Sequence, residues 1–120
     1  IDGDGSFLMH MGSLGTAAKK AGSNFKYILI NNGAHESVGG QPTIAFDIDV
    51  GNILKSLGFK NVYKAFSSEE ISKYMKSLKT QELSAMTIYT RQGSREDLGR
   101  PTTTPIENKL AMMEKLNAKR

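Results

Sequence analysis

Two stretches decide the fold: Gly3-Asp4-Gly5-Ser6, and the run Phe25-Lys26-Tyr27-Ile28-Leu29-Ile30-Asn31-Asn32-Gly33. The run is rich in aromatic and β-branched residues and ends in Asn-Asn-Gly, which is typical of a buried strand that enters a turn. Ile1-Asp2 precedes the first stretch as the last residues of a strand would. The sequence therefore predicts two strands that each end in a polar loop containing glycine.

The segment between these stretches predicts a helix over residues 8–21. Its apolar residues recur at steps of three and four, and Gly22 follows as a C-terminal stop. The apolar face consists of Leu8, Met11, Leu14, Ala18 and Ala21. The chain thus opens with a strand, helix, strand unit.

The rest of the chain continues this alternation. Residues 33–46 carry three glycines and a proline without a sustained period, which indicates a long loop of the kind that holds ligands. The later predicted elements are a helix over 47–57, a strand over 61–66, a helix capped by Ser67, a strand over 84–90 and a last helix that begins near Pro105. Strands alternating with helices imply right-handed crossovers. We predict an α/β fold with a parallel sheet and helices on both faces.

Composition excludes several classes of function. The chain has 120 residues, of which 38% are hydrophobic and 23% charged, as expected of one globular domain. It has no cysteine, which removes disulfides, thiolate nucleophiles and Cys-based metal sites. No apolar run approaches the roughly 20 residues that span a bilayer, so we expect no membrane partner and a cytoplasmic location. The net charge of +4 suits an anionic ligand but is too diffuse to predict nucleic-acid binding.

The two polar loops predict a ligand site. Parallel sheets bind ligands beyond the carboxyl ends of their strands, so Gly3-Asp4-Gly5-Ser6 and 31–34 should lie beside each other. The glycines around Asp4 let the backbone approach a bulky anion, and the following helix points free N–H groups at it. Asp4 and Asn32 are hard oxygen donors of the kind that Mg²⁺ prefers. We predict a site that clamps Mg²⁺ and a diphosphate.

The pair of motifs resembles that of thiamine-diphosphate-dependent enzymes, in which Gly-Asp-Gly is followed by Asn-Asn; here Asn32 comes 28 positions after Asp4. The resemblance implies thiamine diphosphate as the cofactor, with Mg²⁺ as the expected ion and Mn²⁺ or Ca²⁺ as substitutes. It implies three metal ligands: the side chains of Asp4 and Asn32 and the backbone carbonyl of Ala34. It also implies cofactor contacts at Gly3, Gly5 and Ser6, with the diphosphate on backbone N–H groups near the last two.

A closer resemblance covers most of the chain. Residues 3–12, 32–43 and 97–105 resemble the phosphonopyruvate decarboxylases, and the sulfopyruvate decarboxylases are similar through the first two blocks. The third block, Leu-Gly-Arg-Pro-Thr-Thr-Thr-Pro, favours the phosphonate enzymes. This resemblance implies decarboxylation of 3-phosphonopyruvate to phosphonoacetaldehyde and CO₂ in phosphonate biosynthesis. It makes residues 1–120 the C-terminal part of the diphosphate-binding domain.

The same resemblance implies that half of the active site lies elsewhere. In this superfamily a pyrimidine-binding domain, of the same or another chain, carries the carboxylate that activates the cofactor, and the assemblies are oligomers. Ile1 is not an initiator methionine, so we expect the chain to begin inside a larger protein. We expect a homo-oligomer that acts on a 2-keto acid, and an isolated chain that is catalytically silent.

Four further residues are candidates for the substrate end of the site. His35 could hydrogen-bond substrate or move a proton near neutral pH, although a packed or solvated loop histidine is the simpler interpretation. Gly39 and Gly40 could let the backbone fold over the thiazolium end while Gln41 donates to the substrate. The alternative for these three is a flexible turn before Pro42.

Other polar residues are weaker candidates. The glutamate that donates a proton in some related decarboxylases would fall on Val38, so Glu36 is displaced from that position. Arg95 and Arg100 could bind a phosphonate, or could be solvated surface charges. His10 fits packing or capping within the first helix.

Three alternatives to the main interpretation stay open. One is a sulfopyruvate decarboxylase β-type chain that works with a separate α chain. Another is a non-catalytic diphosphate-binding module. The third is a flavodoxin-like nucleotide binder, which would lack the Mg²⁺ requirement.

Overall fold

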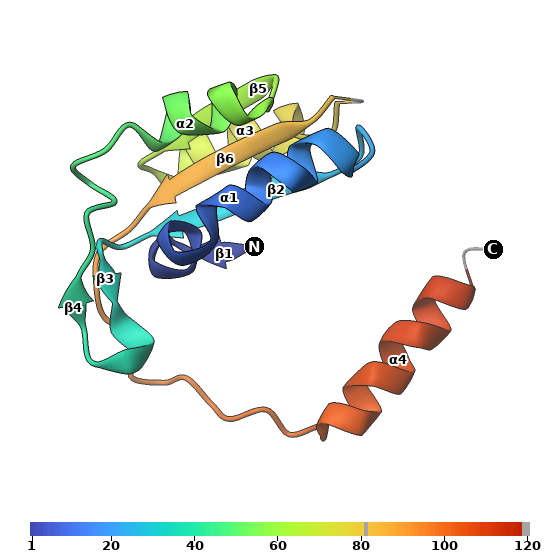
Figure 1. The fold of residues 1–120 in the computed structure, drawn as a ribbon. Helices are drawn as coiled ribbons and strands as arrows, with labels where there is room; N and C mark the ends of the chain where they lie inside the picture. Colours follow the sequence, from blue (N-terminus) through green and yellow to red (C-terminus); the bar gives the residue numbers. More distant parts are fainter. Residues whose placement is uncertain (81, 119–120) are drawn as a thin grey trace.

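The computed structural model describes residues 1–80 and 82–118, and its centre is a four-stranded sheet (Figure 1). The strands are β1 (Asp2–Gly3), β2 (Lys26–Asn31), β5 (Asn61–Ala65) and β6 (Ser84–Tyr89). Their order across the sheet is β1-β2-β6-β5, and every neighbouring pair is parallel. The predicted α/β fold with a parallel sheet is confirmed.

Two helices, α1 (Asp4–Lys20) and α2 (Val50–Leu57), cover one face of the sheet. The buried side chains on this face are Phe7, Leu14, Tyr27, Leu29, Val50, Leu54, Phe59, Leu83 and Ala85. Each large apolar side chain that is fully buried contributes about 1.5–3 kcal/mol. This packing holds α1, through Phe7 and Leu14, against Tyr27 and Leu29 of β2.

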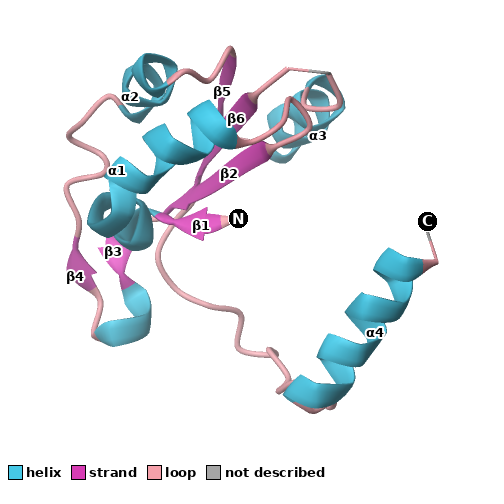
Figure 2. Cartoon of the chain, turned by 45° about the vertical axis from the view of Figure 1, so that its right-hand side comes forward, coloured by secondary structure: helices cyan, strands magenta, loops and turns pink. Residues whose placement is uncertain are grey.

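The opposite face is covered by α3 (Ser68–Ser77), as Figure 2 shows. Ser67 caps this helix by accepting a hydrogen bond from the backbone N–H of Glu70, as the sequence predicts. Tyr74 stacks on Tyr63 of β5 with ring centroids 4.9 Å apart. The prediction of helices on both faces is therefore confirmed.

The first helix begins earlier than the sequence analysis predicts. It starts at Asp4 rather than at residue 8, and it is kinked at His10, whose φ and ψ are −126° and 24°. Gly3 is extended and serves as the N-cap residue without a side-chain cap. An acid in the first turn is stabilised by the helix dipole, which favours a start at Asp4. Gly5 and Ser6 consequently lie in helical backbone and not in a turn.

The predicted long loop over 33–46 contains a small hairpin. Its elements are β3 (Ala34–His35), the 3-10 helix η1 (Glu36–Val38) and β4 (Gln41–Pro42), with β3 and β4 antiparallel. Gly39 and Gly40 turn the chain with φ of 125° and 76°. The next helix, α2, starts at Val50 rather than residue 47, because Asp49 caps it by accepting from the N–H of Asn52.

The last helix, α4 (Pro105–Asn117), is present as predicted but its apolar side is not covered. Thr104 and Glu107 form a capping box at its start. Figures 1 and 2 show α4 well apart from the sheet. The exposed apolar residues along it are Ile106, Leu110, Met112, Met113 and Leu116. Among the described residues, no helix is both long and apolar enough to cross a membrane.

Candidate functional site

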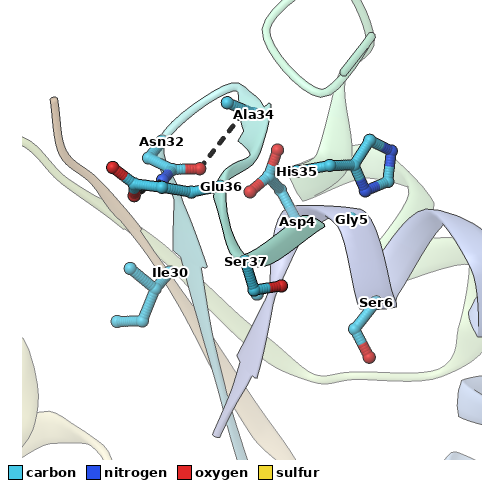
Figure 3. Close-up of a pocket in the computed structure, with 10 residues that line it drawn as sticks. Asp4, Gly5, Ser6, Ile30, Asn32, Ala34, His35, Glu36 and Ser37 are labelled. Carbon is cyan, nitrogen blue, oxygen red and sulfur yellow. Dashed lines mark hydrogen bonds between the residues drawn. The ribbon is translucent and has the colours of Figure 1, made fainter. Parts of the chain in front are cut away.

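A pocket of about 340 Å³ opens at the carboxyl ends of β1 and β2 (Figure 3). It is lined by Gly3, Asp4, Gly5, Ser6, Ile30, Asn32, Ala34, His35, Glu36 and Ser37. Because Gly3 pairs with Ile30 in neighbouring strands, the two polar loops of the sequence meet here. The pocket therefore has the position that ligands take in parallel α/β sheets.

Asp4 brings a buried carboxylate to this pocket. Asp4 is 2% exposed, and its Oδ2 accepts a hydrogen bond from the hydroxyl of Thr43. The ion pairs found within the described residues are Lys64 with Asp49 and Arg95 with Asp97, so no described cation pairs with Asp4. A buried carboxylate is costly unless it is paired or coordinates a metal. Asp4 thus has the chemistry of a metal ligand.

Asn32 and Ala34 face Asp4 across the pocket (Figure 3). The Asn32 amide nitrogen donates to Glu36 Oε2 at 2.7 Å, and its Oδ1 accepts from the Ala34 N–H at 3.1 Å. The preceding Asn31 is buried, and its amide nitrogen donates instead to the Ala45 carbonyl at 3.1 Å. Of the Asn-Asn pair, one residue anchors the loop and the other presents an amide to the pocket.

The start of α1 has the features of an anion-binding helix N-terminus. Gly3 offers no side chain to the first N–H groups of this 17-residue helix, and those N–H groups have no partner within a helix. Such an N-terminus binds phosphate oxygens well. In the described part of the chain, no group of three or more His, Cys, Asp or Glu side chains could hold a metal. The donors present are one carboxylate, one amide oxygen and a backbone carbonyl, and this set fits Mg²⁺ shared with a diphosphate.

His35 lines the pocket, but its ring lies beside Gly5 and points away from Asn32 (Figure 3). A Cβ placed on Gly5 would come within 2.4 Å of His35 Nδ1, so a side chain at position 5 cannot coexist with this ring position. The pocket wall is therefore built by contact between the first turn of α1 and β3. A role for His35 in moving protons stays a prediction.

Several predicted residues lie outside the pocket. Gly39, Gly40 and Gln41 are exposed at the tip of the β3–β4 hairpin, and the structure does not bring them to Asp4. Arg95 is exposed and forms a 2.8 Å ion pair with Asp97. The weaker candidates His10 and Arg100 are also exposed and outside the pocket, as is Val38, the position at which a proton-donating glutamate was expected and is not found.

Sequence reasoning missed two contacts of the predicted metal ligands. Thr43, the partner of Asp4, lies 39 positions away from it, and no local spacing could have indicated that contact. The sequence makes Glu36 a weak candidate for proton donation, whereas in the structure its carboxylate accepts a hydrogen bond from the Asn32 amide. Its position four residues after Asn32 was the available signal.

Comparison with known proteins is consistent with this geometry. Residues 1–88 match the protein family described as "Thiamine pyrophosphate enzyme, C-terminal TPP binding domain". A phosphonopyruvate decarboxylase from Streptomyces viridochromogenes is 35% identical over 108 residues, which are 89% of this chain and 27% of that protein. The chain thus spans about a quarter of the length of the curated phosphonopyruvate decarboxylases that it matches.

Sulfopyruvate decarboxylases are also similar. The one from Methanosarcina acetivorans is 34% identical over 96 residues, which cover 78% of this chain and 25% of that protein. A sulfopyruvate decarboxylase subunit beta from Methanococcus maripaludis is 28% identical over 113 residues, 94% of this chain and 60% of the relative. The similar proteins are therefore decarboxylases of two named kinds.

Proposed function

Because the chain belongs to the family of C-terminal TPP-binding domains of thiamine pyrophosphate enzymes, we propose that it supplies the diphosphate and Mg²⁺ half of a decarboxylase active site. In this proposal residues 1–120 are the C-terminal part of the diphosphate-side domain. The rest of the site comes from a pyrimidine-binding domain of the same or another chain, in a cytoplasmic homo-oligomer.

One observation carries the proposal: the buried Asp4 carboxylate has no cationic partner among the described residues and faces the Asn32 amide across the pocket. Asp4 Oδ, Asn32 Oδ1 and the Ala34 carbonyl would hold Mg²⁺. The backbone N–H groups of Gly5 and Ser6 would bind the diphosphate, aided by the dipole of α1.

Thiamine diphosphate, when bound, supplies the electron sink that loss of CO₂ from a 2-keto acid requires. The residues of this chain position the diphosphate end, and His35, at the edge of the pocket, hydrogen-bonds the substrate or moves a proton. The hairpin tip, with Gly39, Gly40 and Gln41, serves the substrate end, where the Gln41 amide donates to the substrate. Because these residues lie outside the pocket around Asp4, metal binding takes place at the base of the hairpin and substrate contact at its tip.

The proposed substrate is 3-phosphonopyruvate, which gives phosphonoacetaldehyde and CO₂. The support is the 35% and 34% identity with two phosphonopyruvate decarboxylases over 108 residues. 3-Sulfopyruvate is the second candidate, because sulfopyruvate decarboxylases are similar over comparable lengths. Both substrates combine a 2-keto acid with a tetrahedral anionic group.

The test is CO₂ release by the whole protein that contains this chain. It is offered 3-phosphonopyruvate, 3-sulfopyruvate and pyruvate, each with and without thiamine diphosphate and Mg²⁺. We expect cofactor-dependent turnover that prefers phosphonopyruvate and is lost in Asp4→Asn, and the exposed Asp47 provides the matched control Asp47→Asn. A preference for sulfopyruvate would change the substrate and keep the site. Cofactor binding without turnover of any keto acid would indicate a non-catalytic module.

A further inference from the structure

We propose that Glu36 is a positioning residue that holds the Asn32 side-chain amide with its oxygen toward Asp4. The inference rests on the proposed function, because it assumes that Asn32 Oδ1 is a metal ligand. Glu36 is not itself one of the proposed metal ligands. The evidence for its positioning role is the set of hydrogen bonds around one amide group.

The Asn32 side-chain amide has one hydrogen-bond acceptor and one hydrogen-bond donor as partners. Glu36 Oε2 lies 2.7 Å from the amide nitrogen, and a carboxylate can only accept. The Ala34 N–H lies 3.1 Å from Oδ1, and a backbone N–H can only donate. A reversed amide would place oxygen against oxygen at Glu36 and two donors against each other at Ala34. The two partners therefore select a single orientation, and in Figure 3 the oxygen is on the Asp4 side.

Glu36 is itself held in place from outside the pocket. Its other oxygen, Oε1, accepts a hydrogen bond from the backbone N–H of Gly93, in the segment that follows β6. Gly93 has φ of 100°, a conformation that side chains rarely adopt, and it does not line the pocket around Asp4. The carboxylate thus links the loop after β2 to the loop after β6, and both of its oxygens are engaged.

A contact of this kind alters metal affinity in two ways. It removes the amide orientation in which a nitrogen faces the ion, and a charge-assisted hydrogen bond from the amide nitrogen makes the amide oxygen a better donor of electrons. Loss of such a supporting residue typically weakens metal binding by about 10–100-fold. We expect a loss in that range for Glu36→Gln, because the amide that replaces the carboxylate could present either its oxygen or its nitrogen to Asn32.

The experiment measures Mn²⁺ binding to the whole protein by electron paramagnetic resonance, without substrate turnover. The variants are Glu36→Gln, Gly93→Ala and Asp4→Ala. The matched control is Glu70→Gln, because Glu70 also accepts from a backbone N–H, that of Phe66 at 2.7 Å, on α3 and outside the pocket. Circular dichroism checks that each variant is folded.

We expect Asp4→Ala to abolish tight Mn²⁺ binding, Glu36→Gln to weaken it by about 10–100-fold, Gly93→Ala to weaken it less, and Glu70→Gln to leave it unchanged. Gly93→Ala tests the same link if Glu36→Gln does not fold. The positioning role is overturned if Asp4→Ala loses Mn²⁺ binding while Glu36→Gln binds Mn²⁺ with wild-type affinity. If Glu36→Gln does not fold, wild-type affinity in Gly93→Ala overturns it in the same way. Either result leaves the proposed function standing. Wild-type affinity in Asp4→Ala would overturn the proposed function and this inference with it.

Discussion

Replacement of Gly5 by alanine tests how the pocket wall is built. The new methyl group would lie 2.4 Å from His35 Nδ1 and 2.7 Å from its Cε1. Carbon and nitrogen atoms in contact are normally about 3.5 Å apart, so the ring must move by about 1 Å. His35 adjoins Ala34, a predicted metal ligand, and we expect the displaced ring to disturb the position of that ligand.

The expected effect is a large loss of activity without a loss of helix. A misplacement of about 1 Å at a catalytic site costs about 100-fold in rate. Alanine is a better helix former than glycine by about 1 kcal/mol, so α1 itself should not weaken. We therefore expect Gly5→Ala to lower kcat/KM of the whole protein by about 100-fold and to weaken Mn²⁺ binding, while the helical signal in circular dichroism is retained.

The control is Gly12→Ala, in the same helix, where an added Cβ meets nothing within 4 Å. It should keep wild-type kcat/KM. A double variant, Gly5→Ala with His35→Ala, removes the obstructing ring and should recover Mn²⁺ affinity. If Gly5→Ala binds Mn²⁺ as tightly as the wild type, or if the double variant recovers nothing, the contact between α1 and β3 does not position the metal ligands.

Three further predictions concern stability. Thr43→Val removes the hydroxyl that donates to the buried Asp4, and we expect a loss of about 2 kcal/mol in the free energy of unfolding by urea; an unchanged midpoint would show that this hydrogen bond contributes nothing. Leu54→Ala empties a site that is 0% exposed and should cost about 3 kcal/mol in the same assay, whereas a loss below about 1 kcal/mol would mean that the core collapses around it. Burial, with the nearby Asp2 carboxylate and its hydrogen bond, raises the pKa of Tyr27 above its ordinary value of 10.0. As the pH rises, the folded state keeps the Tyr27 proton after the unfolded state has lost it. The Tyr27 hydroxyl therefore makes its full contribution to the free energy of unfolding below pH 10, and this contribution is lost as the pH rises toward the raised pKa. Tyr27→Phe should flatten the alkaline fall in stability, measured by urea unfolding at several pH values, and an unchanged slope would assign that fall to other groups.

The sequence was sufficient for the sheet and for the two loops that form the pocket. The β-branched and aromatic run before Asn31 predicted a buried strand, and β2 confirms it. The adjacency of Asp4 and Asn32 followed from a general rule, because parallel neighbouring strands end at the same edge. Short-period patterns of residue type were therefore enough to predict the strands and the loops that follow them, where the backbone is regular.

The parts that the sequence did not predict depend on contacts between distant segments. The start of α1 at Asp4 contradicts the low helix propensity of Gly5, and packing of Phe7 in the core outweighs that propensity. The Glu36 contact to Gly93 joins residues 57 positions apart. Neither spacing nor composition indicated that the loop after β6 would reach the loop after β2 and contact Glu36 there.

The order of strands in the sheet has a consequence for the synthesis of the protein. β6 lies between β2 and β5, although it is the last of the four strands to leave the ribosome. Until residues 84–89 are available, β2 and β5 have no common neighbour, and each exposes backbone groups to any passing strand. Insertion of this strand closes contacts of long sequence separation, which is a slow step in folding. A nascent chain that stalls before β6 is therefore more prone to aggregate than one in which β6 is in place.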